Sequence, residues 1–133
     1  MLKFLCYPKC TTCQKAQKWL DENNISYELR NIKEENPTAE ELGQWYRVSG
    51  LPLRRFFNTS GLIYKSMDLK NKLPAMSEEE MISLLASDGM LVKRPILAGE
   101  GMVFVGFKES DWADKLRQIK ISLFSIEADF LCK

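Results

Sequence analysis

Cys10-Thr11-Thr12-Cys13 is the stretch that best indicates the fold of this chain, because it joins an apolar segment to the start of a helix. The preceding segment, Leu2–Tyr7, is mostly apolar and free of breakers, which predicts a strand. Pro8 then forces a turn, since proline cannot continue a strand ladder. The apolar residues that follow the motif recur at helical spacing: Ala16, Trp19 and Leu20. We therefore expect the two cysteines in the first turn of a helix that follows a strand.

That position has chemical consequences for the two thiols. A helix N-terminus carries unpaired N–H groups and the positive end of the helix dipole, and both favour an anion. Cysteines in such settings have pKa values of roughly 3.5–7.5, against about 8.5 for a free thiol. Cys10 is therefore predicted to attack as a thiolate, and Cys13, one turn further in, to resolve the resulting disulfide. A strand, a turn, Cys-x-x-Cys and a helix are typical of a thioredoxin-like redox motif.

Two other interpretations of the cysteines stay open at this point. A structural zinc site needs four ligands, and the sequence has no histidine, so only Cys6 and Cys132 remain to complete one. A pair of inert buried cysteines is the other alternative, because free cysteine behaves as a small hydrophobe. The pattern favours redox chemistry over both, and no metal is expected.

Composition narrows the class of protein. The chain has 133 residues, 45% hydrophobic and 28% charged, which suits one globular domain with a core. A net charge of +1 gives no electrostatic case for nucleic acid or a membrane surface. The apolar start is too short for a signal peptide, and no stretch is long enough to span a bilayer. We therefore expect a cytoplasmic protein whose cysteines are reduced at rest.

The rest of the chain predicts a mixed α/β fold. Residues 25–32 alternate apolar and polar side chains, which indicates a second strand parallel to the first. Thr38 with Glu41, and Ser77 with Glu80, have the spacing of capping boxes that open helices. The turn at 99–101 joins two antiparallel strands, and a last helix follows. This order predicts a thioredoxin-like mixed four-stranded sheet with helices on both faces.

Several segments of the chain together resemble the arsenate reductase-like family, over about residues 1–118. That family groups glutaredoxin-linked arsenate reductases with Spx-type redox regulators. The segments are Tyr7–Ala16, Phe57–Gly61, Leu91–Ile96 and Val105–Phe107. The resemblance implies a single domain with a thioredoxin-like core (1–33 and 89–118), an inserted helical subdomain (34–88) and an apolar C-terminal tail (119–133). The tail is expected to pack on the domain, with an association surface as the alternative.

The resemblance also implies roles for residues that spacing alone does not mark. It implies a cis peptide before Pro95 that faces the active cysteine, and it places Arg94 beside the nucleophile to stabilise a thiolate or bind an oxyanion. Arg54 matches a second arginine of the reductases, with Arg55 as the competing candidate. The expected substrate- or oxyanion-binding residues are Thr11, Thr12, Arg54 and Pro95.

Two departures from the reductases bear on the substrate. Those enzymes have serine where this chain has Cys13, and their third arginine falls about where this chain has Phe107. Both departures disfavour arsenate and favour an enzyme that resolves its own disulfide. We expect a thiol–disulfide oxidoreductase that acts on a small-molecule or protein disulfide and is reduced by thioredoxin, glutaredoxin or a low-molecular-weight thiol, with no bound cofactor. The alternative is a Spx-like redox sensor that binds RNA polymerase.

Overall fold

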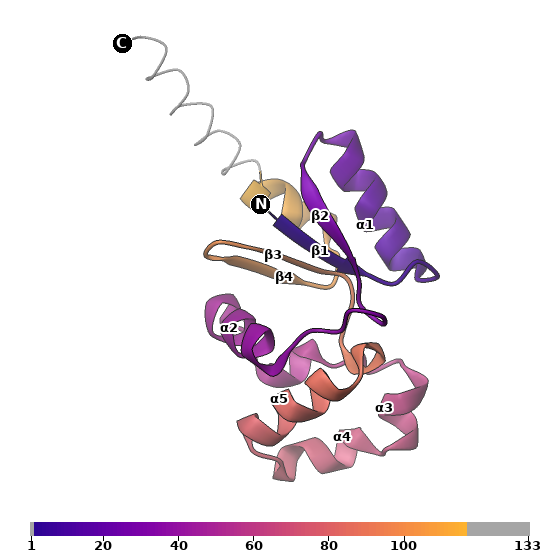
Figure 1. Cartoon of the computed structure of the whole chain (residues 1–133), viewed down its shortest axis with the longest axis vertical. Helices are drawn as coiled ribbons and strands as arrows, with labels where there is room; N and C mark the ends of the chain where they lie inside the picture. Colours follow the sequence, from indigo (N-terminus) through magenta and orange to yellow (C-terminus); the bar gives the residue numbers. More distant parts are fainter. Residues whose placement is uncertain (1, 117–133) are drawn as a thin grey trace.

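The sheet at the centre of the molecule has four strands in the order β2-β1-β3-β4 (Figure 1). The structure is a computed structural model, and it describes residues 2–116. The strands are β1 (Leu2–Cys6), β2 (Tyr27–Asn31), β3 (Ile96–Gly99) and β4 (Met102–Val105). β1 pairs with β2 in parallel, whereas β3 pairs with β1 and β4 antiparallel, so the predicted mixed sheet is confirmed.

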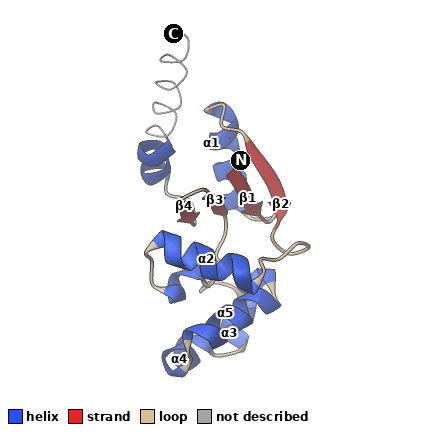
Figure 2. Cartoon of the chain, turned by 60° about the vertical axis from the view of Figure 1, so that its left-hand side comes forward, coloured by secondary structure: helices blue, strands red, loops and turns tan. Residues whose placement is uncertain are grey.

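The helices lie on both faces of this sheet, as the sequence predicts (Figure 2). Helix α1 (Thr11–Glu22) and a helix over residues 109–116 cover one face, and α2 (Ala39–Ser49) covers the other. Beyond α2 lie α3 (Leu62–Ser66), α4 (Leu69–Lys72) and α5 (Glu78–Ser87), with three short 3-10 turns, η1 (Leu53–Phe56), η2 (Leu73–Ala75) and η3 (Gly89–Leu91).

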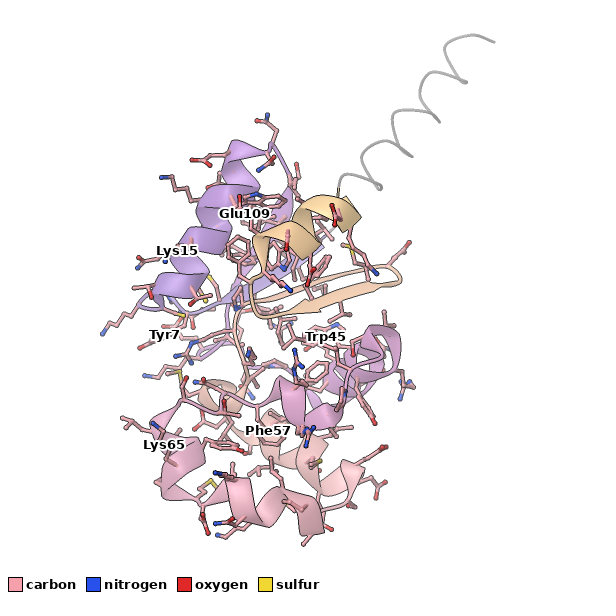
Figure 3. All side chains as sticks on the ribbon, turned by 180° about the vertical axis from the view of Figure 1, so that it is seen from behind. Tyr7, Lys15, Trp45, Phe57, Lys65 and Glu109 are labelled. Carbon is pink, nitrogen blue, oxygen red and sulfur yellow. The ribbon has the colours of Figure 1, made fainter. Side chains whose placement is uncertain are left out.

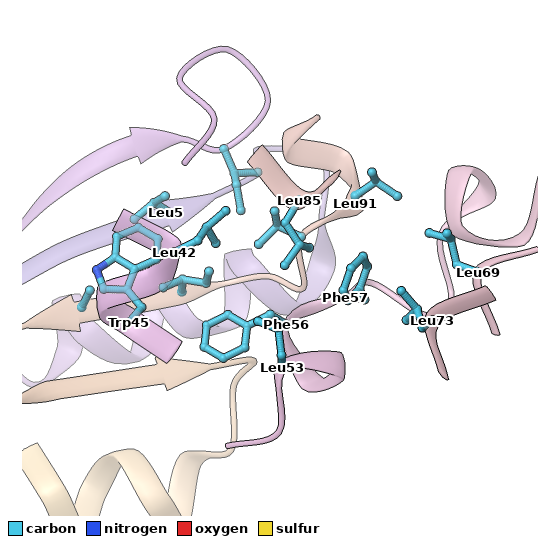
Figure 4. Packing of buried hydrophobic residues seen from close by; sticks show 14 residues of the cluster. Leu5, Leu42, Trp45, Leu53, Phe56, Phe57, Leu69, Leu73, Leu85 and Leu91 are labelled. Atoms are coloured by element: carbon cyan, nitrogen blue, oxygen red, sulfur yellow. The ribbon is translucent and has the colours of Figure 1, made fainter. Parts of the chain in front are cut away.

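Alternation along β1 divides the core into two clusters, because successive side chains of a strand point to opposite faces. Phe4 and Cys6 pack under α1 and the helix that carries Trp112, whereas Leu5 packs towards α2. The larger cluster continues from the sheet into the helices beyond α2, where it includes Phe56, Phe57, Leu69, Leu73 and Leu85 (Figure 4). The second face of the sheet and the segment 53–91 therefore share one core.

The predicted helix caps differ in detail. Thr38 and Glu41 form a complete capping box at the start of α2. Ser77 accepts from the Glu80 N–H at 3.1 Å, but its hydroxyl, and not its backbone N–H, contacts the Glu80 carboxylate. Gly50, in the left-handed region with φ of 68°, ends α2 where the sequence has Gly-Leu-Pro. The predicted tail 119–133, with Cys132, lies outside the described residues, and the subdomain limits remain predictions.

Candidate functional site

Cys10 is the N-cap residue of α1, where the chain turns out of β1. Its N–H donates to the carbonyl of Tyr7 at 3.0 Å, and its own carbonyl accepts the first helical bond from Gln14 at 3.0 Å. No side chain caps this end of the helix, so the N–H groups of the first turn point outward without a side-chain acceptor. The Cys10 side chain is half-buried, which leaves its sulfur within reach of a partner.

Cys13 lies one turn further along α1 and is only 1% exposed. Its Sγ accepts a hydrogen bond from the Tyr7 N–H at 3.3 Å and lies within hydrogen-bonding reach of the Cys10 thiol. The structure therefore brings Cys10 and Cys13 together, the first facing out and the second facing the core. The predicted proximity of the two cysteines is therefore confirmed, and their roles as attacking and resolving thiols stay predictions.

Cys6 is a third thiol of the site, and it is the residue to which sequence reasoning gave no redox role. It ends β1, is 5% exposed, and belongs to the same buried cluster as Cys13. The hydrogen bond from the Cys13 thiol lowers the pKa of Cys6, and the same bond, together with burial, raises the pKa of Cys13. All three are free thiols. Among residues 2–116, no group of three His, Cys, Asp or Glu side chains is arranged to hold a metal ion.

Arg94 lies in the segment just before β3 and packs against Tyr7, three residues before Cys10. Its guanidinium lies over the Tyr7 ring, 5.1 Å from the centroid, and its Nη1 contacts the Met90 Sδ at 3.7 Å. The Nε is buried and has no hydrogen-bond partner. A buried donor without an acceptor is costly, so the Nε is an unsatisfied polar group of this site. The predicted cis peptide between Arg94 and Pro95 is present.

The other predicted site residues fall in two places. Thr11 and Thr12 are exposed on the first turn of α1, and Pro95 is buried, its carbonyl accepting from the Gly106 N–H at 2.8 Å. Arg54, in contrast, lines a surface cavity of about 200 Å³ that includes neither cysteine. The residues around that cavity are Arg54, Arg55, Phe57, Thr59, Tyr64 and Lys93.

Lys93 connects this cavity to the thiols through the chain, because it directly precedes Arg94. Its N–H donates to the Phe56 carbonyl at 2.8 Å, which ties the segment before Pro95 to the η1 turn. In Figure 3, Tyr7 lies between α1, marked by Lys15, and the segment that carries Phe57 and Lys65. The site therefore sits where the thioredoxin-like sheet meets the helices beyond α2.

Phe107 occupies the position at which the reductases are expected to have a third arginine. Its ring packs edge-on against Trp112, with the centroids 4.8 Å apart, and tilted against Trp19 at 6.4 Å. This aromatic packing joins α1 to the helix over residues 109–116. The position therefore contributes apolar contact and no positive charge.

Fold and site together define a thioredoxin-like protein with neighbouring cysteines at the start of its first helix. The ArsC family model matches residues 5–115, and the chain belongs to that family. It is 50% identical over 113 residues to YusI of Bacillus subtilis, covering 85% of this chain and 96% of that protein.

Further relatives carry other descriptions. An ArsC family related protein from Bacteroides fragilis has a solved structure that is 57% identical, with a TM-score of 0.83, covering 85% of this chain and 95% of that one. The global transcriptional regulator Spx of Staphylococcus saprophyticus is 28% identical over 111 residues, covering 84% of this chain and 83% of the regulator. No helix within residues 2–116 has the length and apolar character needed to cross a bilayer.

Proposed function

We propose that the protein is a cytoplasmic thiol–disulfide oxidoreductase of the ArsC family that uses Cys10 and Cys13 as its redox couple. The observation that carries this proposal is the pairing of a half-buried thiol at the uncapped start of α1 with a buried thiol one turn behind it. A pair of this kind can attack a disulfide and then release itself from the product.

The reaction consists of two thiol–disulfide exchanges. The Cys10 thiolate attacks one sulfur of a substrate disulfide, forms a mixed disulfide and releases the first substrate thiolate. The Cys13 sulfur then attacks the Cys10 Sγ, closes the Cys10–Cys13 disulfide and releases the second substrate thiolate. The substrate is reduced by two electrons and the protein is oxidised by two. An external dithiol of the thioredoxin or glutaredoxin class, or a low-molecular-weight thiol, returns the couple to its reduced form by the same exchange.

The residues around Cys10 stabilise negative charge in this scheme. The outward N–H groups of Thr11 and Thr12, at the positive end of the α1 dipole, face an anion at Cys10. Arg94 adds a permanent charge whose Nε has no partner in the resting site. In this scheme we expect Pro95 to face the substrate beside Arg94, and we expect Arg54, which lines a separate cavity, to receive an acidic group of the substrate there. Arsenate is disfavoured, because Phe107 brings no third cation.

Trapping the mixed disulfide tests this proposal. In a Cys132→Ser background, Cys13→Ser is expected to hold a stable adduct with a disulfide substrate, which mass spectrometry should locate at Cys10. Cys10→Ser is the matched control and is expected to form no adduct at the motif. A Cys13→Ser protein that reacts with oxidants at the normal rate and accumulates no adduct would rule out the resolving role.

The Spx regulators supply a second candidate function. The 28% identity over most of both chains supports a redox sensor that binds RNA polymerase, in which the Cys10–Cys13 couple switches the binding surface and turns over no substrate. Pull-downs from a cell lysate with oxidised and reduced protein separate the two. Stoichiometric capture of a polymerase subunit in one redox state supports the sensor, and catalytic turnover without capture supports the oxidoreductase.

A further inference from the structure

The guanidinium of Arg94 contacts weak acceptors. The centroid of the Tyr7 ring lies 5.1 Å from it, its Nη1 contacts the Met90 Sδ at 3.7 Å, and its buried Nε has no hydrogen-bond partner. Within residues 2–116, none of the ion pairs includes Arg94. Because an aromatic face and a thioether accept hydrogen bonds weakly, a stronger acceptor placed beside this guanidinium would bind it.

Met90 lies four residues before Arg94, in the η3 turn. Its N–H donates to the Asp88 Oδ1 at 2.9 Å, and the residues on either side of it, Gly89 and Leu91, are buried. The backbone of the turn is therefore held in place. Met90 itself is half-buried, so a small oxidant can approach its side chain. Its thioether is thus fixed against a cation and open to chemical modification.

We propose that Met90 is a site of reversible oxidation, and that its sulfoxide binds Arg94 in competition with the anion at Cys10. Hydrogen peroxide transfers one oxygen atom to the Met90 Sδ: the O–O bond breaks, an S=O bond forms, the sulfur loses two electrons and water leaves. The product has a strong acceptor where the thioether was a weak one. Its oxygen accepts a hydrogen bond from the Arg94 Nη1, which already contacts the sulfur.

This inference rests on the proposed function, in which Arg94 stabilises negative charge at Cys10. A guanidinium held by the sulfoxide oxygen is less available to that anion, so oxidation of Met90 slows the first thiol–disulfide exchange. The modification also differs from cysteine oxidation in how it is reversed. A dithiol reduces a disulfide, whereas the sulfoxide persists until a methionine sulfoxide reductase removes its oxygen. Inhibition through Met90 therefore outlasts the oxidation of the cysteines.

Peroxide treatment with the thiols protected tests the proposal. In a Cys132→Ser background, methyl methanethiosulfonate blocks the accessible thiols, hydrogen peroxide oxidises the methionines, and dithiothreitol then frees the thiols. Mass spectrometry of peptides measures the oxygen gained at Met90. We expect the oxidised protein to release the first coloured thiolate from dithiobis(nitrobenzoate) about 10-fold more slowly than the untreated protein. Treatment with methionine sulfoxide reductases A and B should restore the rate.

Three variants separate the sulfoxide from other effects of peroxide. Met90→Leu keeps an apolar side chain without the sulfur, so its first release should match that of the starting protein and stay unchanged after peroxide. Met81→Leu is the matched control, because Met81 is also half-buried, in α5, and its loss should leave the peroxide effect intact. Met90→Gln supplies an amide oxygen as a permanent acceptor and should slow the release without peroxide. In an Arg94→Met background, Met90→Gln should have no further effect, because the cation that it binds is gone.

Three results would overturn the proposal. The first is an unchanged rate of release after Met90 has gained its oxygen. The second is a Met90 that stays unoxidised while Met81 is oxidised. The third is equal slowing by Met90→Gln with and without Arg94, which would show that the glutamine acts through packing.

Failure of the proposed function gives a different result. The untreated protein would then react at Cys10 no faster than an unfolded thiol, or Arg94→Met would release the coloured thiolate at the rate of the starting protein. Either result concerns protein that peroxide has not touched, and either would make the inference about Met90 wrong as well.

Discussion

Replacing Arg94 by methionine should leave the protein at least as stable and slow its reaction with a disulfide substrate. The buried Nε of Arg94 has no partner, and leaving such a donor unsatisfied costs about 1–3 kcal/mol. The stacking of the guanidinium on Tyr7 at 5.1 Å stabilises the folded state by about 0.5–2 kcal/mol. The contact with the Met90 sulfur adds little, because a thioether is a weak acceptor. Methionine keeps the length and apolar packing of the arginine stem. We therefore expect Arg94→Met to raise the free energy of unfolding by about 1 kcal/mol.

The expected cost appears in the reaction. A charge-assisted contact to the attacking thiolate or an anionic substrate contributes about 1.5–3 kcal/mol, so Arg94→Met should slow the first thiol release from a chromogenic disulfide about 10- to 100-fold. Arg94→Lys keeps the charge but loses the planar guanidinium, so its rate of thiol release should lie between those of the starting protein and Arg94→Met. Urea unfolding measures the stability, and stopped-flow absorbance measures the release.

Arg47→Met is the matched control for the loss of one positive charge. Arg47 is exposed in the last turn of α2, away from the cysteines, and its replacement should leave the release rate unchanged. If Arg94→Met lowers the free energy of unfolding by about 2 kcal/mol or more while thiol release keeps its rate, Arg94 is a structural residue and the reasoning fails.

The fold itself supports two further predictions. Arg30 forms a two-point ion pair with Glu41 at 2.7 and 2.9 Å and lowers its pKa from 4.5 to about 2. The pair contributes stability that is complete above pH 4.5 and is lost as the pH falls through about 2. Glu41→Gln should lower the free energy of unfolding by about 1–2 kcal/mol at neutral pH, and urea unfolding should then show a smaller loss of stability between pH 4.5 and 2. A mutant that loses as much stability as the starting protein over this pH range would contradict the prediction. A Cβ at Gly89 would lie 1.7 Å from the Ile32 carbonyl oxygen, so Gly89→Ala should lower the free energy of unfolding by about 3 kcal/mol. Gly43 lies inside α2, where a Cβ would meet its nearest neighbour at 3.5 Å, so Gly43→Ala should raise the free energy of unfolding by up to about 1 kcal/mol. Equal effects of the two substitutions would contradict this packing.

The sequence predicts local structure well where local rules decide it. Pro8 ends β1, and helical spacing after the motif predicts α1, because both depend on neighbouring residues. The second strand begins at Tyr27 and not at Ile25, since the Ile25 N–H still bonds the Leu20 carbonyl at the end of α1. Residues 62–73 show no clean period, and their short helices are held by the burial of Leu69 and Leu73 in a core built from distant segments.

The site is less visible in the sequence than the fold. Cys6 shares its strand parity with Phe4, which could have placed it on the side of the sheet that faces α1. The sequence does not show, however, how deeply Cys13 is buried or that Cys6 and Cys13 belong to the same buried cluster. The stacking of Arg94 on Tyr7 joins residues that are far apart in the sequence, and the antiparallel pairing of β1 with β3 brings their segments together. The unpartnered Nε is likewise a property of packing alone.

Equilibration of the protein in redox buffers of graded potential, followed by alkylation and peptide mapping, tests the dithiol most directly. A sulfur pair that cycles in a reducing compartment should form a Cys10–Cys13 disulfide with a midpoint between about −220 and −320 mV. Both cysteines alkylated at every potential, or cross-linked to other partners, would contradict the account.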